Sequence, residues 1–242
     1  QAVSGDVTIV ACEYGLTSQV FHGRIERMKR RQLHHLVLAC LTVVVLSLAL
    51  AYGPDMQAPD RFSIVSAYVC CGFFAIALLI GPAQAIRTGK PSTNNYLRRD
   101  IGVWAALTGL MHLVTATGLS MTTSYMDAYV NVGDRVPSDG IRAQLFTWGS
   151  ILGFIVGVVF LMLLALSSNL AMRLLGIRVW KNLQRMSYLA FSLSVAHGLA
   201  FQVLESRERI LIAVVIGAAT VILAAQLAGA RAVRRSAKQK YG

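Results

Sequence analysis

Six long runs of apolar residues constrain this chain more than any other feature of its sequence. A helix needs about 20 mostly apolar residues to cross a bilayer core about 30 Å thick, and each run is long enough to do so. Charged residues or the helix breakers Gly and Pro separate the runs. We therefore predict an all-α membrane protein, a six-helix transmembrane bundle over residues 33–230, in which short loops make neighbouring helices antiparallel. The six runs lie near residues 33–53, 62–86, 100–121, 144–168, 181–204 and 209–230.

The composition supports a membrane location and argues against a soluble domain. Hydrophobic residues make up 55% of the 242 residues and charged residues 14%, against roughly 45–50% and about 25% in soluble proteins. The net charge of +12 comes from clusters between apolar runs, where Lys and Arg face anionic lipid headgroups. We therefore expect these clusters to bind membrane lipid and no nucleic acid. Residues 1–32 are expected to form a basic N-terminal interfacial arm, and residues 231–242 a basic C-terminal tail.

The distribution of Lys and Arg predicts the orientation of the bundle. If the runs alternate in direction, 18 of the 23 Lys and Arg residues lie on the side that holds both termini and the connections 87–99 and 169–185. The other side holds Arg61, Arg135, Arg142, Arg207 and Arg209. Because Lys and Arg are enriched in cytoplasmic loops, we expect both termini in the cytoplasm. The loop 122–143 is then the largest external feature and the natural surface for an external partner.

The cysteines and the first residues of the chain carry no further motif. The spacing of Cys12, Cys40, Cys70 and Cys71 matches no metal site, and three of them lie inside apolar runs, where a thiol behaves as a small hydrophobic group. The first apolar run follows a mostly polar segment without a small-residue cleavage site, so we expect no signal peptide.

Two histidines stand apart because they lie deep inside apolar runs. An ionisable side chain within a membrane is costly, so each one is a candidate for function. His112 lies 13 residues after Arg99 and His197 lies 16 residues after Lys181, which a rise of about 1.5 Å per residue converts to depths of roughly 20 and 24 Å. At similar depths on parallel helices, two imidazoles can hold one flat macrocycle from opposite faces. We therefore predict that His112 and His197 are the axial ligands of a haem iron.

A structural interpretation of the same histidines competes with this one. Each could instead hydrogen-bond to a nearby backbone or Ser/Thr oxygen and simply join helices. The matching depths favour coordination, and small residues beside the pair, among them Gly109 and Gly198, would leave room for a porphyrin. His34 and His35 open the first run beside an Arg/Lys cluster and His22 lies in the arm, so these three are weaker ligand candidates.

Two segments carry a resemblance to a known family. They are Arg98-Arg99-Asp100-Ile101-Gly102, which runs into His112, and Trp180-Lys181-Asn182-Leu183-Gln184-Arg185-Met186-Ser187-Tyr188-Leu189-Ala190, which runs into His197. Over about residues 33–230 the chain resembles the ferric reductase-like transmembrane domain family, and within it the haem-binding membrane subunit (MsrQ/YedZ type) of the periplasmic methionine sulfoxide reductase system. The resemblance implies a bacterial inner membrane protein with b-type haem held by histidines on the third and fifth helices. It also implies electron transfer from a cytoplasmic or quinone donor to an acceptor at the outer face.

One departure from the family pattern limits the expected cofactor content. Family members commonly carry a histidine where this chain has Gln184, and the residue at the same level of the third helix is Arg99. Neither is an ordinary ligand of haem iron, so we expect one haem b, in the outer half of the membrane. The inner level lies about 20 Å away by helix rise, a gap that another carrier would have to bridge. Arg99 and Gln184 are therefore a candidate site for a quinone or a partner on the inner side.

Two classes of function follow from these observations. In the first, the chain is an electron-transfer subunit of an oxidoreductase, fed by a quinol or a flavoprotein because it has no Gly-rich dinucleotide-binding motif of its own. In the second, it is a non-catalytic accessory or structural subunit of a larger respiratory or photosynthetic membrane complex. Such a subunit would keep one haem, none, or a chlorin whose magnesium takes one histidine. The retained deep histidines favour the first class, and the missing second ligand favours the second.

Overall fold

Seven helices make up the part of the chain that the computed structural model describes, which is residues 4–53, 57–90, 96–120, 140–204 and 209–241. No strand occurs within these residues. The helices are α1 (Ser4–Tyr52), α2 (Ala58–Thr88), α3 (Tyr96–Ser120), α5 (Ile141–Leu166), α6 (Asn169–Gln184), α7 (Met186–Leu204) and α8 (Arg209–Tyr241).

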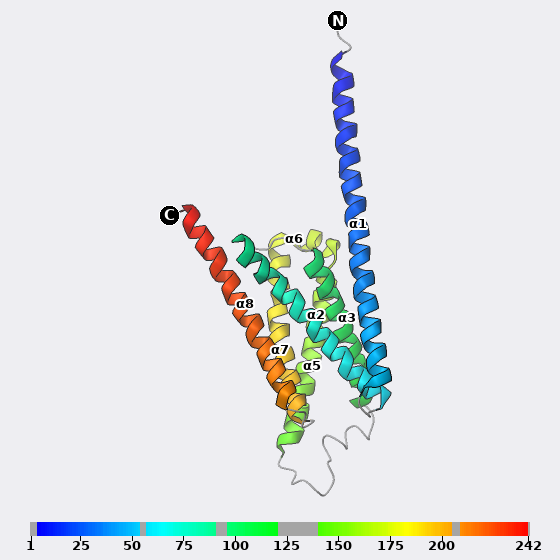
Figure 1. Cartoon of the computed structure of the whole chain (residues 1–242), viewed down its shortest axis with the longest axis vertical. Helices are drawn as coiled ribbons and strands as arrows, with labels where there is room; N and C mark the ends of the chain where they lie inside the picture. Colours follow the sequence, from blue (N-terminus) through cyan, green and yellow to red (C-terminus); the bar gives the residue numbers. More distant parts are fainter. Residues whose placement is uncertain (1–3, 54–56, 91–95, 121–139, 205–208, 242) are drawn as a thin grey trace.

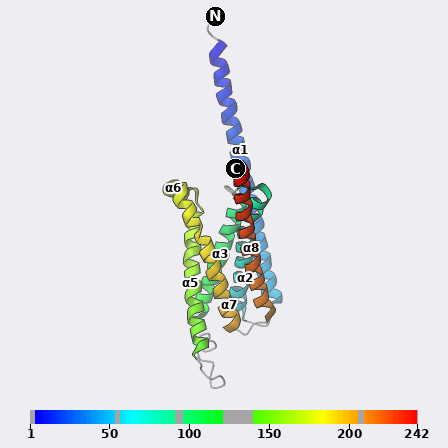
Figure 2. The same cartoon turned by 90° about the vertical axis from the view of Figure 1, so that its left-hand side faces the viewer.

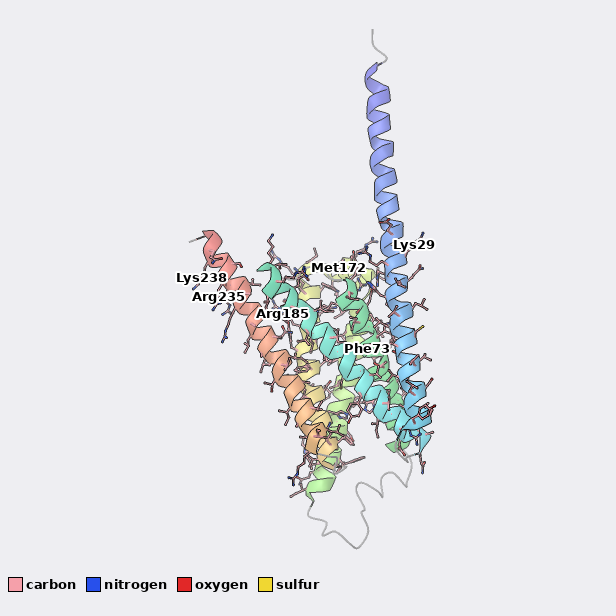
Figure 3. All side chains as sticks on the ribbon, viewed as in Figure 1. Lys29, Phe73, Met172, Arg185, Arg235 and Lys238 are labelled. Atoms are coloured by element: carbon pink, nitrogen blue, oxygen red, sulfur yellow. The ribbon has the colours of Figure 1, made fainter. Side chains whose placement is uncertain are left out.

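Six segments of this fold are long and apolar enough to cross a membrane, which confirms the predicted six-helix bundle of a multi-pass membrane protein. Successive segments run in opposite directions, so both termini lie at the same end (Figure 1). The labelled basic side chains Lys29, Arg235 and Lys238 lie toward that end (Figure 3). The cytoplasmic location of this end stays a prediction.

Five helices form a closed ring, and α1 packs on its outside. Around the ring α2 contacts α3, α3 contacts α5, α5 contacts α7, α7 contacts α8, and α8 returns to α2, while α1 packs against α2 and α3. Phe74 of α2 belongs to the buried core and makes edge-to-face contacts with Phe160 of α5 and Phe191 of α7, at centroid distances of 5.2 and 6.4 Å. α5 separates α3 from α7 around the ring. Both helices line its interior, and their side chains can meet there.

α8 is attached to α2 at a proline. Pro82 lies inside α2, and because proline has no N–H, the carbonyl of Leu78 loses its helical partner. The side-chain amide of Gln226 donates to that carbonyl at 2.9 Å, and the hydroxyl of Tyr188 donates to Gln226 Oε1 at 3.4 Å. A Cβ on Gly229 would come within 2.9 Å of the proline Cα. α8 thus supplies a hydrogen bond that α2 cannot make for itself.

Two segments are helical where the sequence predicted only a connection or an arm. The connection expected at 169–185 contains the helix α6. The fifth apolar segment runs from Leu170 to Leu204 and covers α6 and α7, but the two are separate helices, and α7 begins at Met186. The residues 4–32 of the expected interfacial arm continue the first span as one helix, α1, which extends beyond the rest of the bundle in both views (Figures 1 and 2). Most of the predicted external loop, residues 121–139, lies outside the described residues.

Candidate functional site

The structure brings His112 of α3 and His197 of α7 together inside the ring of helices. Their ring centroids are 6.0 Å apart and their planes meet at 64°. Both side chains are partly buried, and Phe201, one turn after His197, packs on its ring at a centroid distance of 5.1 Å. The two imidazoles therefore lie at one depth, as the helix rise predicted, while their role as iron ligands stays a prediction.

A backbone carbonyl of a neighbouring helix holds each imidazole. Nδ1 of His112 lies 2.9 Å from the carbonyl oxygen of Ser63 in α2 and 3.1 Å from its hydroxyl. Nδ1 of His197 lies 2.8 Å from the carbonyl oxygen of Gly149 in α5. Because a carbonyl oxygen only accepts, Nδ1 carries the proton in both neutral rings and Nε2 keeps its lone pair. Metal-binding histidines commonly donate from their second nitrogen in this way, so both rings are prepared to coordinate through Nε2.

A row of glycines on α5 lets the histidine-bearing helices approach closely. Gly149, Gly153 and Gly157 are four residues apart and lie on one face of the helix. A Cβ on Gly153 would come within 2.7 Å of His197 Cε1, and a Cβ on Gly157 within 2.5 Å of Leu113 Cδ2 in α3. This row was not predicted from the sequence, although small residues four apart in an apolar run are a known signal for close helix contacts in membranes.

The centroid distance of the histidine pair agrees with that of two imidazoles on opposite sides of one metal. Two imidazoles bonded at about 2 Å to opposite sides of a metal have centroids about 6 Å apart, once about 1 Å from nitrogen to centroid is added on each side. The observed distance is 6.0 Å. A metal held by protein alone usually takes three or four side-chain ligands, and no three His, Cys, Asp or Glu side chains gather for that purpose in the part of the chain that the structure describes. A macrocycle such as a porphyrin takes two axial ligands from the protein, which is the number of imidazoles that the pair offers.

The small residues expected to leave room for a porphyrin divide into two kinds. A Cβ on Gly109 would come within 2.8 Å of the Phe160 ring and 3.0 Å of Cys70 Sγ. Gly109 therefore allows α3 to pack closely against α2 and α5. This corrects the expectation that Gly109 leaves open space for a porphyrin. A Cβ on Gly198 would meet nothing within 4 Å, so this side of α7 does have room next to the histidine.

A second group of polar residues surrounds Asp100, toward the end of α3 that faces the termini. The Asp100 side chain is 0% exposed, and its Oδ1 accepts from Nε and Nη2 of Arg31 at 3.2 and 3.0 Å. Oδ2 lies 3.1 Å from Nδ1 of His34, and Oδ1 lies 3.5 Å from Nε2 of His35. The indole N–H of Trp104 donates to Nδ1 of His35 at 3.1 Å. These bonds compensate the buried carboxylate and attach α1 to α3.

The Asp100 group accounts for two of the weaker ligand candidates. His34 and His35 both have Asp100 as a partner, whereas the side chain of His22 lies outside the described residues. The signal that sequence reasoning overlooked was a single acidic residue beside basic ones at the start of an apolar run, since a carboxylate carried into a membrane needs a partner. Arg99 is in the first turn of α3 and Gln184 is the last residue of α6, and their role as a quinone or partner site stays a prediction.

Comparison with known proteins adds no identification to this geometry. The chain matches no known protein-family model and no curated protein sequence. The resemblance to the ferric reductase-like family therefore stays a prediction that rests on the residues quoted for it, and the histidine pair is the candidate site by its own geometry.

Proposed function

We propose that the chain is a b-type haem membrane protein that relays electrons across or within the bilayer to an acceptor at the outer face. In this proposal His112 and His197 are the axial ligands of the haem iron. The observation that carries it is the 6.0 Å spacing of two imidazoles whose Nδ1 atoms both contact backbone carbonyls, because two Nε2 lone pairs are then left for one metal. A bis-histidine haem b would supply one-electron chemistry at this position.

The surrounding residues would orient the ligands and exclude water. The carbonyls of Ser63 and Gly149 fix the rotation of the two rings, and a hydrogen bond to the outer nitrogen raises the basicity of the coordinating one. The Phe201 ring packs on His197, and the buried Phe146 of α5 packs on Phe201 at a centroid distance of 6.0 Å. An apolar shell of this kind controls solvent access and the reduction potential of a bound metal.

The donor and the orientation complete the proposal. The excess of Lys and Arg at the end that holds both termini favours a cytoplasmic location for that end. The resemblance to the ferric reductase-like family implies that the membrane is the inner membrane of a bacterium. The electron donor is then a quinol or a flavoprotein at the inner side, where Arg99 and Gln184 are the candidate contacts. The outer acceptor would dock on the loop 122–143, most of which lies beyond the described residues.

A second candidate function is a non-catalytic accessory or structural subunit of a larger respiratory or photosynthetic membrane complex. One observation favours it. The hydrogen bonds of the two histidines join α3 to α2 and α7 to α5, so the pair stabilises the helix bundle even without a metal. In that role the histidines connect helices, and the chain carries one haem or none.

The absorption spectrum and haem content of the purified protein test for the haem on which the first function depends. The proposal expects about one haem per chain with the sharp reduced bands of low-spin iron. His112→Ala and His197→Ala should each lose the haem or turn it high-spin, because the iron is left with one axial ligand. His34→Ala and His35→Ala make the same chemical change at the Asp100 group and should keep the spectrum. A colourless protein, or a wild-type spectrum in both His112 and His197 variants, would refute the proposal.

A further inference from the structure

The helix α6 presents an unusual surface at the end of the bundle that carries the termini. It connects α5 to α7 and lies at that end in both views (Figures 1 and 2). All eight residues from Met172 to Val179 are exposed. Several of them are large and apolar, and Leu174 and Ile177 are 75% and 62% exposed. An exposed apolar surface of this kind marks a site of interaction with a membrane or another molecule.

A cap and a break shape α6, and one hydrogen bond attaches it to the end of α5. The hydroxyl of Ser168 caps the helix by accepting from the N–H of Ala171 at 3.0 Å. Gly176, with φ 72° and ψ 158°, interrupts the helix. After this break, the indole N–H of Trp180 donates to the carbonyl of Leu166, the last residue of α5, at 2.8 Å. Because α5 and α7 both cross the membrane, a helix held at the end of both lies where hydrocarbon gives way to lipid headgroups.

Basic side chains accompany the apolar ones on this surface. Arg173, Arg178 and Lys181 are exposed, and residues 169–185 contain no Asp or Glu. Water would solvate the arginines but not the leucines, and hydrocarbon would do the reverse. A helix with exposed large apolar side chains and basic ones together is typical of segments that lie in the interface of a membrane, and a tryptophan at this level is typical of the same boundary.

We propose that α6 lies in the membrane interface and binds the phosphate groups of anionic phospholipids. Arg173 and Arg178 contact the phosphates, while Leu174 and Ile177 enter the adjoining hydrocarbon. Anionic lipid is the occupant that the charges favour, because each basic residue near an anionic membrane surface is attracted to it and this segment has no acidic residue to oppose that attraction. The inference depends on the membrane-spanning fold and is independent of the histidine pair.

Hydrogen–deuterium exchange of the full chain in lipid nanodiscs tests the proposal. The amides of residues 169–185 should exchange more slowly in bilayers of phosphatidylcholine with phosphatidylglycerol than in phosphatidylcholine alone. Inorganic phosphate added to the neutral bilayer should not reproduce this protection, because it supplies the anion without the hydrocarbon boundary. Arg173→Gln with Arg178→Gln should remove the difference between the two bilayers.

The matched control makes the same charge change on α8. Arg234→Gln with Arg235→Gln, both exposed, should leave the lipid-dependent protection of α6 intact. Equal exchange of wild-type α6 in the two bilayers would overturn the proposal. If the α6 amides exchange fast in both bilayers, the surface faces water, and it would then be a contact site for a protein partner instead of lipid. Loss of protection in the α8 control would also count against it, because the effect would then belong to the overall charge of this end.

Discussion

Replacing Gly153 by alanine tests whether the close contact of α5 positions His197. The new Cβ would lie 2.7 Å from Cε1 and 2.8 Å from Nδ1 of the imidazole, where ordinary contacts begin at 3.4 Å. The ring or α5 must therefore move by roughly 0.7 Å, and close-packed interiors resist such shifts. A shift of this size would stretch the 2.8 Å bond from Nδ1 to the Gly149 carbonyl to about 3.5 Å, the limit of a hydrogen bond. Overpacking of this kind costs about 1–3 kcal/mol.

Gly198→Ala is the matched control, because its Cβ would meet nothing within 4 Å. Both variants gain about 0.5–1 kcal/mol from the preference of alanine for a helix, and this gain cancels in the comparison. Gly153→Ala should therefore be less stable than Gly198→Ala by about 1–3 kcal/mol, measured by titration with sodium dodecyl sulfate in mixed micelles. Equal stabilities would show that the contact does not constrain the histidine. The comparison is made on haem-free protein, because a porphyrin beside His197 would occupy the space that the new Cβ of Gly198→Ala enters.

Two further predictions concern the attachment of α8 and the orientation of the chain. Gln226→Leu should lower the free energy of unfolding by about 0.6–2 kcal/mol, because it leaves the Leu78 carbonyl without a donor. In a Pro82→Ala background the helix regains its own N–H, so the same substitution should cost less. An equal loss in both backgrounds would contradict the role assigned to Gln226. Tags at residues 1 and 242 should resist external protease in intact cells, while a cleavage site engineered near Asp134 should be cut. Cleavage at either tag would contradict the orientation predicted from the distribution of Lys and Arg.

The sequence predicted those features that depend on local periodicity and missed those that depend on contacts between distant segments. Apolar run length is a local property, so the number of spans could be predicted. The depths of His112 and His197 follow from a fixed helical rise, so their meeting could be predicted as well. The pairing of Arg31 with Asp100 joins residues 69 apart in the chain, and it requires α1 to pack against α3, which no local pattern encodes. The helix α6 was missed because its apolar residues alternate with basic ones, a composition that also occurs in connections.

The two polar groups on α3 face different neighbours because of the helical repeat. Asp100 and His112 are 12 residues apart, which at about 100° per residue turns the side chain by about 120° around the axis and moves it about 18 Å along the axis. The structure agrees with this rotation, since Asp100 faces α1 outside the ring and His112 faces α2 and α7 within it. The charged group therefore lies where α1 covers it, and the neutral pair lies in the interior of the bundle.

This separation predicts that Asp100→Asn will lower the stability of the protein and leave the ligation of the proposed haem unchanged. Removing the carboxylate charge leaves Arg31, which is 32% exposed, without its ionic partner, and should cost about 1–3 kcal/mol in the same detergent titration. At about 18 Å and an effective dielectric constant of about 20, one charge changes the energy at the pair by about 1 kcal/mol. That equals about 40 mV for a one-electron couple. If the proposed haem is present, its spectrum should stay unchanged and its potential should shift by no more than about 40 mV. A high-spin spectrum in Asp100→Asn would show that the two groups are not independent.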